Sequence, residues 1–267
     1  MMRVKEIPML EDNYGYLVVD DATNQAAAID PVEPDKVLAA ASKAGALITH
    51  ILTTHKHWDH AGGNSEMRKL LPDVPVLGGA GDGVAACTWQ VQEGEVFRIG
   101  RDLRVECLLT PGHTMGHMCY AVTDERGPEE RAQRAVFTGD TLFVGGAGKF
   151  FEGSPADMLA SLSKLGALPP ETFVYCGHEY TLQNYAFARW LDPDNPDLAK
   201  AAAAAQAQRA EGLPTVPSTI AVELATNPFM RASALQERVV AQAGSDLRDL
   251  STASVLGKIR EMKNEFK

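Results

Sequence analysis

The first half of the chain consists of short apolar or alternating runs separated by turn residues, a pattern that predicts β-strands. The runs that fit this pattern are residues 4–9, 16–19, 26–29, 46–52 and 74–77. Between them, residues 34–44 have helical composition and end at Gly45, and a second short helix is predicted through residue 71 after a Gly-Gly-Asn sequence. This half of the chain is therefore predicted to be built mainly of strands.

Beyond residue 178 the pattern changes from strands to helices. Residues 182–190, 198–211, 234–242 and 252–266 have the composition and the boundaries of helices. Three prolines between residues 212 and 228 predict a loop that crosses this region. We therefore predict two domains, residues 1–178 and a smaller helical domain of residues 179–267.

A dense group of metal-ligand side chains follows the strand predicted at residues 46–52. His55, His57, Asp59 and His60 fall within six consecutive positions. Neither a strand nor a helix directs all four side chains to one point, so we predict a turn around metal ions. The two histidines spaced by one residue would bind one ion, and the adjacent Asp59 and His60 its neighbour. Imidazoles with a carboxylate and without thiolates suit a cation such as Zn²⁺ and argue against a structural zinc site.

Three later strands are each followed by another residue that can bind a metal. The predicted strands 103–109, 135–137 and 173–176 lead to His113, Asp140 and His178, respectively. A glycine beside each of these side chains allows the backbone to turn sharply and to approach a cofactor closely. Together with the first group they make seven candidate ligands, among which Asp140 is the natural bridge between two ions.

Length, composition and charge exclude several classes of protein. With 267 residues, of which 45% are hydrophobic and 22% charged, the chain has the composition of a globular enzyme. A formal net charge of −10 argues against nucleic-acid binding, and an anionic substrate would need a local basic pocket. The four cysteines show no CxxC spacing and are expected to be reduced. No leader and no membrane-length apolar run is recognisable, so we expect a cytoplasmic monomer that does not bind a membrane.

Several blocks of the sequence carry a family resemblance. Residues 54–60 resemble the T-H-x-H-x-D-H signature of the metallo-β-lactamase superfamily, and further blocks resemble the glyoxalase II family, the hydroxyacylglutathione hydrolases. These blocks are LEDNY at 10–14, THKHWDHAGGN at 54–64, FTGDTLF at 137–143, GKF at 148–150, YCGHEY at 175–180 and NPFMR at 227–231. The resemblance covers essentially the whole chain. It implies an α/β (α+β) fold, the αββα sandwich of the superfamily with two metals at one edge, followed by a smaller helical domain.

The resemblance also implies a role for individual residues. One metal would be bound by His55, His57 and His113, the other by Asp59, His60 and His178, with Asp140 and a hydroxide between them. The glutathione part of the substrate would be held by Lys149, Tyr180, Arg260 and Lys263. Phe151 stands where the family often has tyrosine, so the hydroxyl group that would bind the tripeptide is missing and this contact is left open.

The predicted site favours a thioester hydrolase. A hydroxide between two cations is nucleophilic at neutral pH, because the cations lower the pKa of bound water to about 7. By the resemblance it would cleave S-D-lactoylglutathione, or a related 2-hydroxyacylglutathione, to glutathione and D-lactate, the second step of methylglyoxal detoxification. Asp140 as the bridge and Asp59, which would also orient the hydroxide, are the candidate catalytic residues. Zinc is the expected metal, and iron and manganese suit the same ligands.

Two other functions remain open on the sequence. A superfamily relative with a single Fe²⁺, bound by two histidines and one carboxylate, would instead oxidise a glutathione persulfide with O₂. A binding or assembly module that keeps only the metal signature is the second alternative. The complete second ligand set, with Asp59 and His60, favours the hydrolase over the first, and the presence of all seven ligands favours it over the second.

Four other residues receive a more ordinary interpretation. His50 lies within a strand and is expected to be a core or surface histidine. His117 is interpreted as a support for a ligand or as a helix cap. Trp58 is predicted to pack under the ligand turn, and Glu179 to be a solvated or orienting carboxylate.

Overall fold

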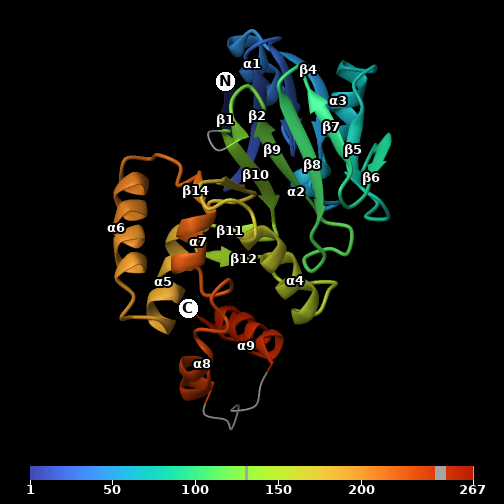
Figure 1. The fold of residues 1–267 in the computed structure, drawn as a ribbon. Coiled ribbons are helices and arrows are strands. Elements are labelled where there is room, and N and C mark those ends of the chain that lie inside the picture. The colour runs from blue at the N-terminus through green and yellow to red at the C-terminus, as the bar shows by residue number, and fades with distance from the viewer. Residues whose placement is uncertain (130–131, 244–250, 267) are drawn as a thin grey trace.

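The computed structural model describes residues 1–129, 132–243 and 251–266 and consists of two six-stranded sheets packed face to face, with helices outside (Figure 1). The first sheet contains, in spatial order, β1 (Met2–Met9), β2 (Asn13–Asp20), β3 (Gln25–Ile29), β4 (Leu47–Leu52), β5 (Val76–Gly79) and β6 (Trp89–Val91). The second contains β14 (Ser218–Thr219), β13 (Phe173–Cys176), β10 (Arg134–Gly139), β9 (Met118–Asp124), β8 (Leu103–Leu109) and β7 (Val96–Ile99). A short hairpin is formed by β11 (Leu142–Phe143) and β12 (Gly146–Ala147).

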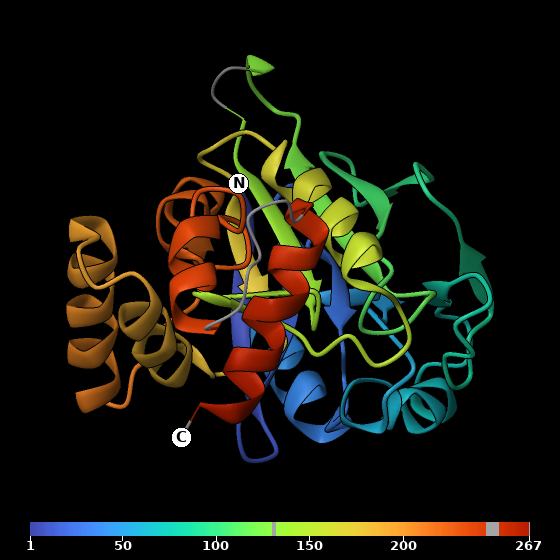
Figure 2. The same ribbon diagram turned by 90° about the horizontal axis from the view of Figure 1, so that it is seen from below.

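Helices cover the outer faces of both sheets. Strands of the first sheet are connected by α1 (Pro34–Ala44), which lies between β3 and β4, and by α2 (Trp58–Ala61) and α3 (Asn64–Leu70), which lie between β4 and β5. The second sheet and the C-terminal region carry α4 (Pro155–Gly166), α5 (Thr181–Leu191), α6 (Pro196–Ala210), α7 (Ile220–Thr226), α8 (Gln236–Ala243) and α9 (Thr252–Glu265). Figure 2 shows α9 lying along the lower side of the molecule near α4. Within the described part of the chain, no helix is long and apolar enough to cross a membrane.

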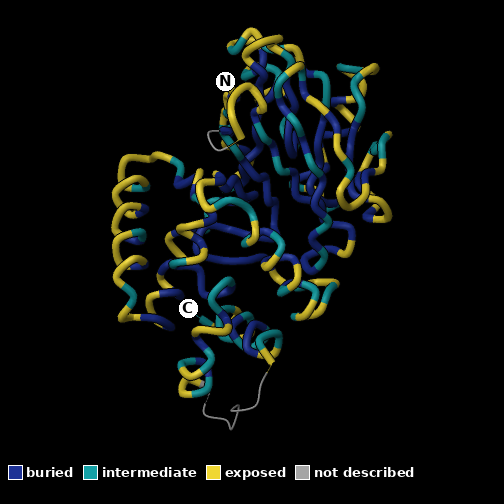
Figure 3. Tube along the Cα trace, in the orientation of Figure 1, coloured by how far each residue is buried: buried dark blue, intermediate teal, exposed yellow. Residues whose placement is uncertain are grey.

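Strand residues alternate between two apolar layers. In β2, Tyr16 and Val18 face the core between the two sheets, whereas Leu17 and Val19 face the core beneath α1. The same alternation in β10 places Phe137 between the sheets and its neighbour against the helices. These strands are apolar on both faces because both faces are covered, which explains why they read as continuous apolar runs. Figure 3 shows this buried interior beneath the exposed helix surfaces.

The αββα architecture confirms the predicted fold class. Three apolar clusters separate the four layers: one between the sheets, one beneath α1, and one between the second sheet and the C-terminal helices. The prediction of a loop at residues 212–228 is wrong in part, because this segment contains β14 and α7. Its prolines flank the helix, which begins where the Thr219 hydroxyl accepts a hydrogen bond from the Val222 amide, so they do not interrupt it.

The topology brings four strand ends to one edge of the sandwich. β8 and β10 are both antiparallel to β9, and β10 is parallel to β13, so β8, β10 and β13 run in the same direction. The segment after β4 joins the same edge, because the Thr54 carbonyl accepts a hydrogen bond from the Met118 amide at 2.8 Å. All four ligand-bearing segments therefore meet there.

Candidate metal centre and adjoining pocket

The segment that carries four of the candidate ligands is a turn between β4 and α2. Two buried carboxylates, Asp30 and Asp82, accept hydrogen bonds from this turn. The amide and the hydroxyl of Thr54 donate to Asp30 at 2.8 and 2.7 Å, and the amide of Lys56 donates to Asp82 at 2.7 Å. The predicted turn is present, and its last residues form the short helix α2.

The seven candidate ligands converge into two groups that share Asp140. One group is His55, His57 and His113, and the other is Asp59, His60 and His178; the ligand atoms within each group lie within 4.8 Å of one another. Nε2 of His55 and Nε2 of His113 lie 2.9 and 3.0 Å from Nδ1 of His57. In the other group, Nε2 of His178 lies 3.2 Å from Nε2 of His60 and 3.4 Å from Oδ2 of Asp59.

Asp140 lies between the two groups. Its Oδ2 is 3.4 Å from Nε2 of His113, and its Oδ1 is 3.3 Å from Nε2 of His60. Oδ1 is buried and accepts no hydrogen bond from the described residues. A buried carboxylate oxygen without a donor is costly unless a cation is bound to it.

The arrangement of these atoms fits two divalent cations. Imidazole nitrogens that face one another at about 3 Å cannot all donate, and metal–nitrogen bonds of about 2.0–2.1 Å place ligand atoms at such separations around one ion. The donor set offers three imidazoles at one position, two imidazoles and a carboxylate at the other, and one shared carboxylate. The protein thus has a candidate dinuclear His/Asp metal site.

Burial and neighbouring charges set the protonation of this cluster. Burial, with the neighbouring His60, lowers the pKa of His55 well below its usual value. Burial opposes the charged form of His60, but the carboxylates of Asp140 and Asp30 outweigh it and raise the pKa of that imidazole. Burial would raise the pKa of Asp140, whereas His60 and His178 hold it well below its usual range. The carboxylate between the groups is therefore ionised at neutral pH, as a cation ligand must be.

His117 lies beside the cluster and supports it. Its fully buried ring stacks on His55 with centroids 5.0 Å apart, and its Nε2 accepts a hydrogen bond from the Asp140 amide at 3.1 Å. Nδ1 is within 3.1 Å of the Thr110 and Thr141 hydroxyls. These contacts agree with the interpretation of His117 as a support for a candidate ligand, and the helix cap is wrong because β9 follows it.

His50, Trp58 and Glu179 differ in their burial and in their contacts. His50 is half-buried and stacks on Phe97 at 5.3 Å, as expected of a structural histidine. Trp58 is 70% exposed, so the prediction that it packs under the ligand turn is wrong. Glu179 accepts hydrogen bonds from the Tyr14 hydroxyl at 2.5 Å and the Thr215 amide at 2.9 Å, which makes it an orienting carboxylate.

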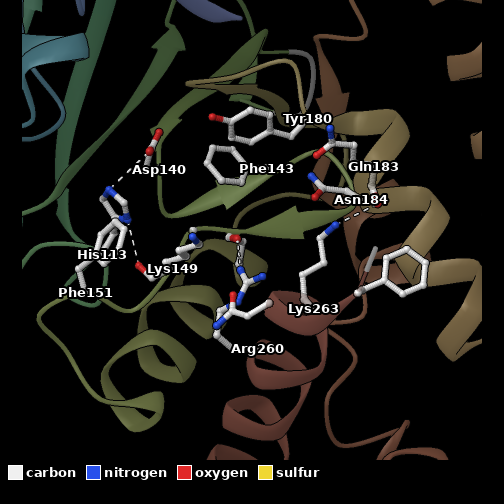
Figure 4. A pocket seen from close by; sticks show the side chains of 14 residues that line it. His113, Asp140, Phe143, Lys149, Phe151, Tyr180, Gln183, Asn184, Arg260 and Lys263 are labelled. Carbon is white, nitrogen blue, oxygen red and sulfur yellow. Dashed lines mark hydrogen bonds and ion pairs between the residues drawn. The ribbon is translucent and has the colours of Figure 1, made fainter.

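A cavity of about 410 Å³ adjoins the metal-ligand cluster (Figure 4). His113 and Asp140 line one end, and residues of α9 line the other. All five substrate-binding candidates line this cavity: Lys149, Phe151, Tyr180, Arg260 and Lys263. Sequence reasoning missed several further lining residues, Phe143, Ala147, Gly148, Gln183, Asn184, Asn264 and Phe266. All seven are uncharged, and only the fold of the chain brings them to the pocket.

Arg260 and Lys263 point into this cavity from one face of α9. Nη1 of Arg260 donates to the Ala147 carbonyl at 2.9 Å, and Nζ of Lys263 donates to the Gln183 carbonyl at 3.0 Å. Burial lowers the pKa of Arg260 to about 10, and burial together with Arg260 lowers the pKa of Lys263 to about 8. Among the described residues, neither side chain forms a salt bridge with a carboxylate. The pair is thus a partly buried pair of cations at the cavity, and no carboxylate of the described residues neutralises it.

Aromatic rings line the cavity beside the candidate metal ligands. The Tyr180 ring stacks on the ring of the candidate ligand His178 with centroids 4.8 Å apart. Phe151 lies near the first ligand group, 5.2 Å from the ring of His113, and is 62% exposed. Nζ of Lys149 lies 6.0 Å from the Phe151 ring centroid. A ligand that extends from the metal centre to α9 would therefore pass along these side chains.

Comparison with known proteins agrees with this architecture. The family model of the metallo-beta-lactamase superfamily matches residues 12–178, and that of the hydroxyacylglutathione hydrolase C-terminus matches residues 179–266. A cytoplasmic hydroxyacylglutathione hydrolase of Arabidopsis thaliana is 46% identical over 267 residues, which are 99% of this chain and 98% of that relative. The chain belongs to the hydroxyacylglutathione hydrolase family. The resemblance inferred from the sequence blocks is thereby confirmed.

Two solved structures are similar in fold to this member of the hydroxyacylglutathione hydrolase family. The crystal structure of ETHE1 from Myxococcus xanthus has a TM-score of 0.64 and 25% sequence identity, with 100% of both chains covered. TTHA1623 in a di-iron-bound form has a TM-score of 0.56 and 27% identity, with 84% of this chain and 98% of that chain covered. The second of these neighbours holds two iron ions.

Proposed function

We propose that this protein hydrolyses the thioester bond of S-D-lactoylglutathione, or a related 2-hydroxyacylglutathione, with two divalent metal ions at the His/Asp cluster. The observation that carries the proposal is one cavity with candidate metal ligands at one end and, at the other, two cations that form no salt bridge with a carboxylate of the described residues. A glutathione thioester has the matching form, with a reactive carbonyl at one end and carboxylates at the other. The names of the family relatives support the same reaction.

The proposed ligand assignment follows the two groups. His55, His57 and His113 would hold one ion, Asp59, His60 and His178 the other, and Asp140 would bridge them. When bound, such cations lower the pKa of a shared water and polarise the carbonyl that it attacks. We propose zinc as the metal, and iron and manganese suit the same donors.

The protein's own residues would orient the reactants. The Asp59 carboxylate faces the cluster and is held there by a hydrogen bond from the Asn13 amide group at 3.2 Å, so it is placed to orient the attacking water. The leaving group is a thiolate, whose conjugate thiol has a pKa of about 8.5, so no strong general acid is needed. Asp140, which stays ionised, would act through its charge.

Substrate recognition is proposed to reside at the α9 end of the cavity. Arg260, Lys263 and Lys149 would bind the glutathione carboxylates, and the Tyr180 ring would pack against the tripeptide. Phe151 would contribute only apolar contact. We propose further that residues 1–178 form the catalytic domain and residues 179–267 the substrate-binding domain. The protein would be a cytoplasmic monomer that acts on a thioester derived from methylglyoxal. The alternative with a single iron is disfavoured because Asp59, His60 and His178 form a complete second group.

Metal removal tests the proposed reaction. Protein treated with a strong chelator is expected to lose hydrolysis of S-D-lactoylglutathione, followed as loss of thioester absorbance, because the activated water is lost with the ions. Activity should return on addition of zinc, iron or manganese and should reach its plateau near two ions per chain by elemental analysis. Full turnover by the metal-free protein would contradict the proposal.

The lowered pKa of Lys263 predicts a pH dependence of substrate affinity. Lys263 is positively charged below its pKa of about 8 and neutral above it, so its attraction for a carboxylate is present at lower pH and is lost as the pH rises through 8. We expect KM for S-D-lactoylglutathione to rise up to about tenfold from pH 7 to 9, the loss of one charge-assisted hydrogen bond. In Lys263→Arg, which stays charged, KM should be flat over this range. Identical profiles for the two proteins would exclude Lys263 as the titrating group.

A further inference from the structure

The β1–β2 loop, taken as residues 10–13 and so including the first residue of β2, carries no candidate ligand but lies against the second ligand group. Its backbone joins the segment around His178: the Tyr14 amide donates to the Gly177 carbonyl at 2.8 Å, and the Glu179 amide donates to the Asp12 carbonyl at 2.9 Å. Asn13 and His178 form an isolated antiparallel bridge between these hydrogen bonds. Two segments more than 160 positions apart are thereby fixed side by side.

Two side chains of this loop reach the ligands themselves. Oδ1 of Asp12 lies 2.8 Å from Nδ1 of His178. The N–H at Nδ1 therefore donates a hydrogen bond to Asp12, which leaves Nε2 without a proton and facing the cluster. Nδ2 of Asn13 donates to the backbone carbonyl of Asp59 at 3.1 Å and to its Oδ2 at 3.2 Å. A carboxylate oxygen has two lone pairs, so Oδ2 can accept this hydrogen bond and still bind a cation. The loop thus fixes the orientation of two ligands of the second group.

The first ligand group is held by other parts of the chain. Nδ1 of His113 lies 2.9 Å from the Lys149 carbonyl, and Nδ1 of His55 lies 3.1 Å from the Thr54 hydroxyl. No side chain of residues 10–13 hydrogen-bonds to this group within the described structure. The third ligand of the second group, His60, has its own partner in Asp30 at 2.9 Å. The β1–β2 loop therefore acts on one ion position and not on the other.

We propose that Asp12 and Asn13 are positioning residues for the second metal position, so that its occupancy depends on the β1–β2 loop while that of the first does not. The inference rests on the two-ion site proposed above. A carboxylate bonded to the far nitrogen of a ligating imidazole fixes its tautomer and raises its basicity, and loss of such a partner costs about 10–100-fold in metal affinity. Loss of the side-chain amide of Asn13 would leave the Asp59 side chain free to rotate away from the ion.

Metal retention in variants of the loop tests this proposal. Asp12→Ala and Asn13→Ala are compared with the wild-type protein and with Glu11→Ala. Glu11 is the exposed neighbour on the same loop, and its side chain forms no hydrogen bond among the described residues. Each zinc-loaded protein is dialysed against a graded series of a weak chelator, and the zinc per chain is measured by elemental analysis. We expect Asp12→Ala and Asn13→Ala to release one ion at chelator concentrations about 10–100-fold lower than the wild type, and to retain the other.

Two further measurements separate positioning from damage to the fold. Asp12→Asn keeps a side-chain oxygen that can accept a hydrogen bond from Nδ1 of His178. This variant should therefore retain the second ion better than Asp12→Ala. Calorimetric affinity for S-methylglutathione, which has no thioester, should be unchanged in every variant, because Arg260 and Lys263 are held by the Ala147 and Gln183 carbonyls and not by residues 10–13. The proposal is overturned if the variants keep both ions like the wild type, if both ions leave together, if Glu11→Ala behaves like its neighbours, or if the wild type holds only one ion.

The outcomes also distinguish this inference from the proposed reaction. Wild-type protein that holds two ions but leaves S-D-lactoylglutathione intact refutes the proposed reaction, while selective release in the variants would still stand. Wild-type protein that hydrolyses the thioester, with both ions retained in Asp12→Ala and Asn13→Ala, refutes the positioning role alone.

Discussion

Asp140→Ala is expected to lower kcat for S-D-lactoylglutathione by at least about 100-fold and to reduce the metal content below two ions per chain. Loss of a partner that only supports a ligand already costs about 10–100-fold in affinity, so loss of a carboxylate shared by two cations should cost more. The repulsion between the cations would also be less compensated. Elemental analysis and steady-state kinetics measure both effects.

The fold should survive this substitution. Asp140 lies at the end of β10, at the edge of the sandwich, and its Oδ1 accepts no hydrogen bond from the described residues. Asp194→Ala removes a carboxylate that is 81% exposed and serves as the matched control, with metal content and kcat expected to equal those of the wild type. Asp140→Asn keeps the shape without the charge and should resemble the alanine variant. Two bound ions and near-normal turnover in Asp140→Ala would show that Asp140 is not the bridge.

The sequence alone predicted the features that depend on local pattern. The turn at residues 54–60 was evident because four candidate ligand side chains are close in sequence. The three later strand ends were evident because a glycine directly precedes each of His113, Asp140 and His178. Helix α4 was missed although its start carries a local signal: Ser154 and Asp157 form a capping box around Pro155 at the first helical turn. Helix α7 was missed because flanking prolines were interpreted as a loop.

The supporting residues of the metal centre were beyond the reach of local pattern. Asp12 contacts the candidate ligand His178, 166 positions away, and Asn13 contacts the candidate ligand Asp59, 46 positions away, so only the packing of the chain brings them together. Asp30 and Asp82 bind the ligand turn from 24 and 26 positions away. The LEDNY block was recognised as a family feature, but its role follows from these contacts. Side-chain exposure was equally hidden, as Trp58 illustrates.

Replacement of both Arg260 and Lys263 by alanine is expected to raise KM for S-D-lactoylglutathione by at least about tenfold with little change in kcat. The substrate carries two carboxylates, the chain carries a net charge of −10, and these two side chains supply positive charge inside the cavity. Each charge-assisted hydrogen bond lost is worth about 1.5–3 kcal/mol when desolvated. Because the contacts lie far from the reacting carbonyl, they should stabilise the ground and transition states equally, and a loss of such uniform binding appears in KM.

The controls for this prediction lie on the same helix. Lys258 is on α9 as well, forms an exposed salt bridge with Glu261 and does not line the cavity, so Lys258→Ala should leave KM unchanged. Arg260 also packs on the Phe229 ring, with 4.9 Å between the guanidinium carbon and the ring centroid, and the melting temperature of each variant therefore accompanies the kinetics. A small neutral thioester, which has no carboxylate to bind, should show the same KM with wild type and double variant. If KM for the glutathione thioester is unchanged, or if KM for the neutral thioester rises equally, the two cations do not recognise the substrate.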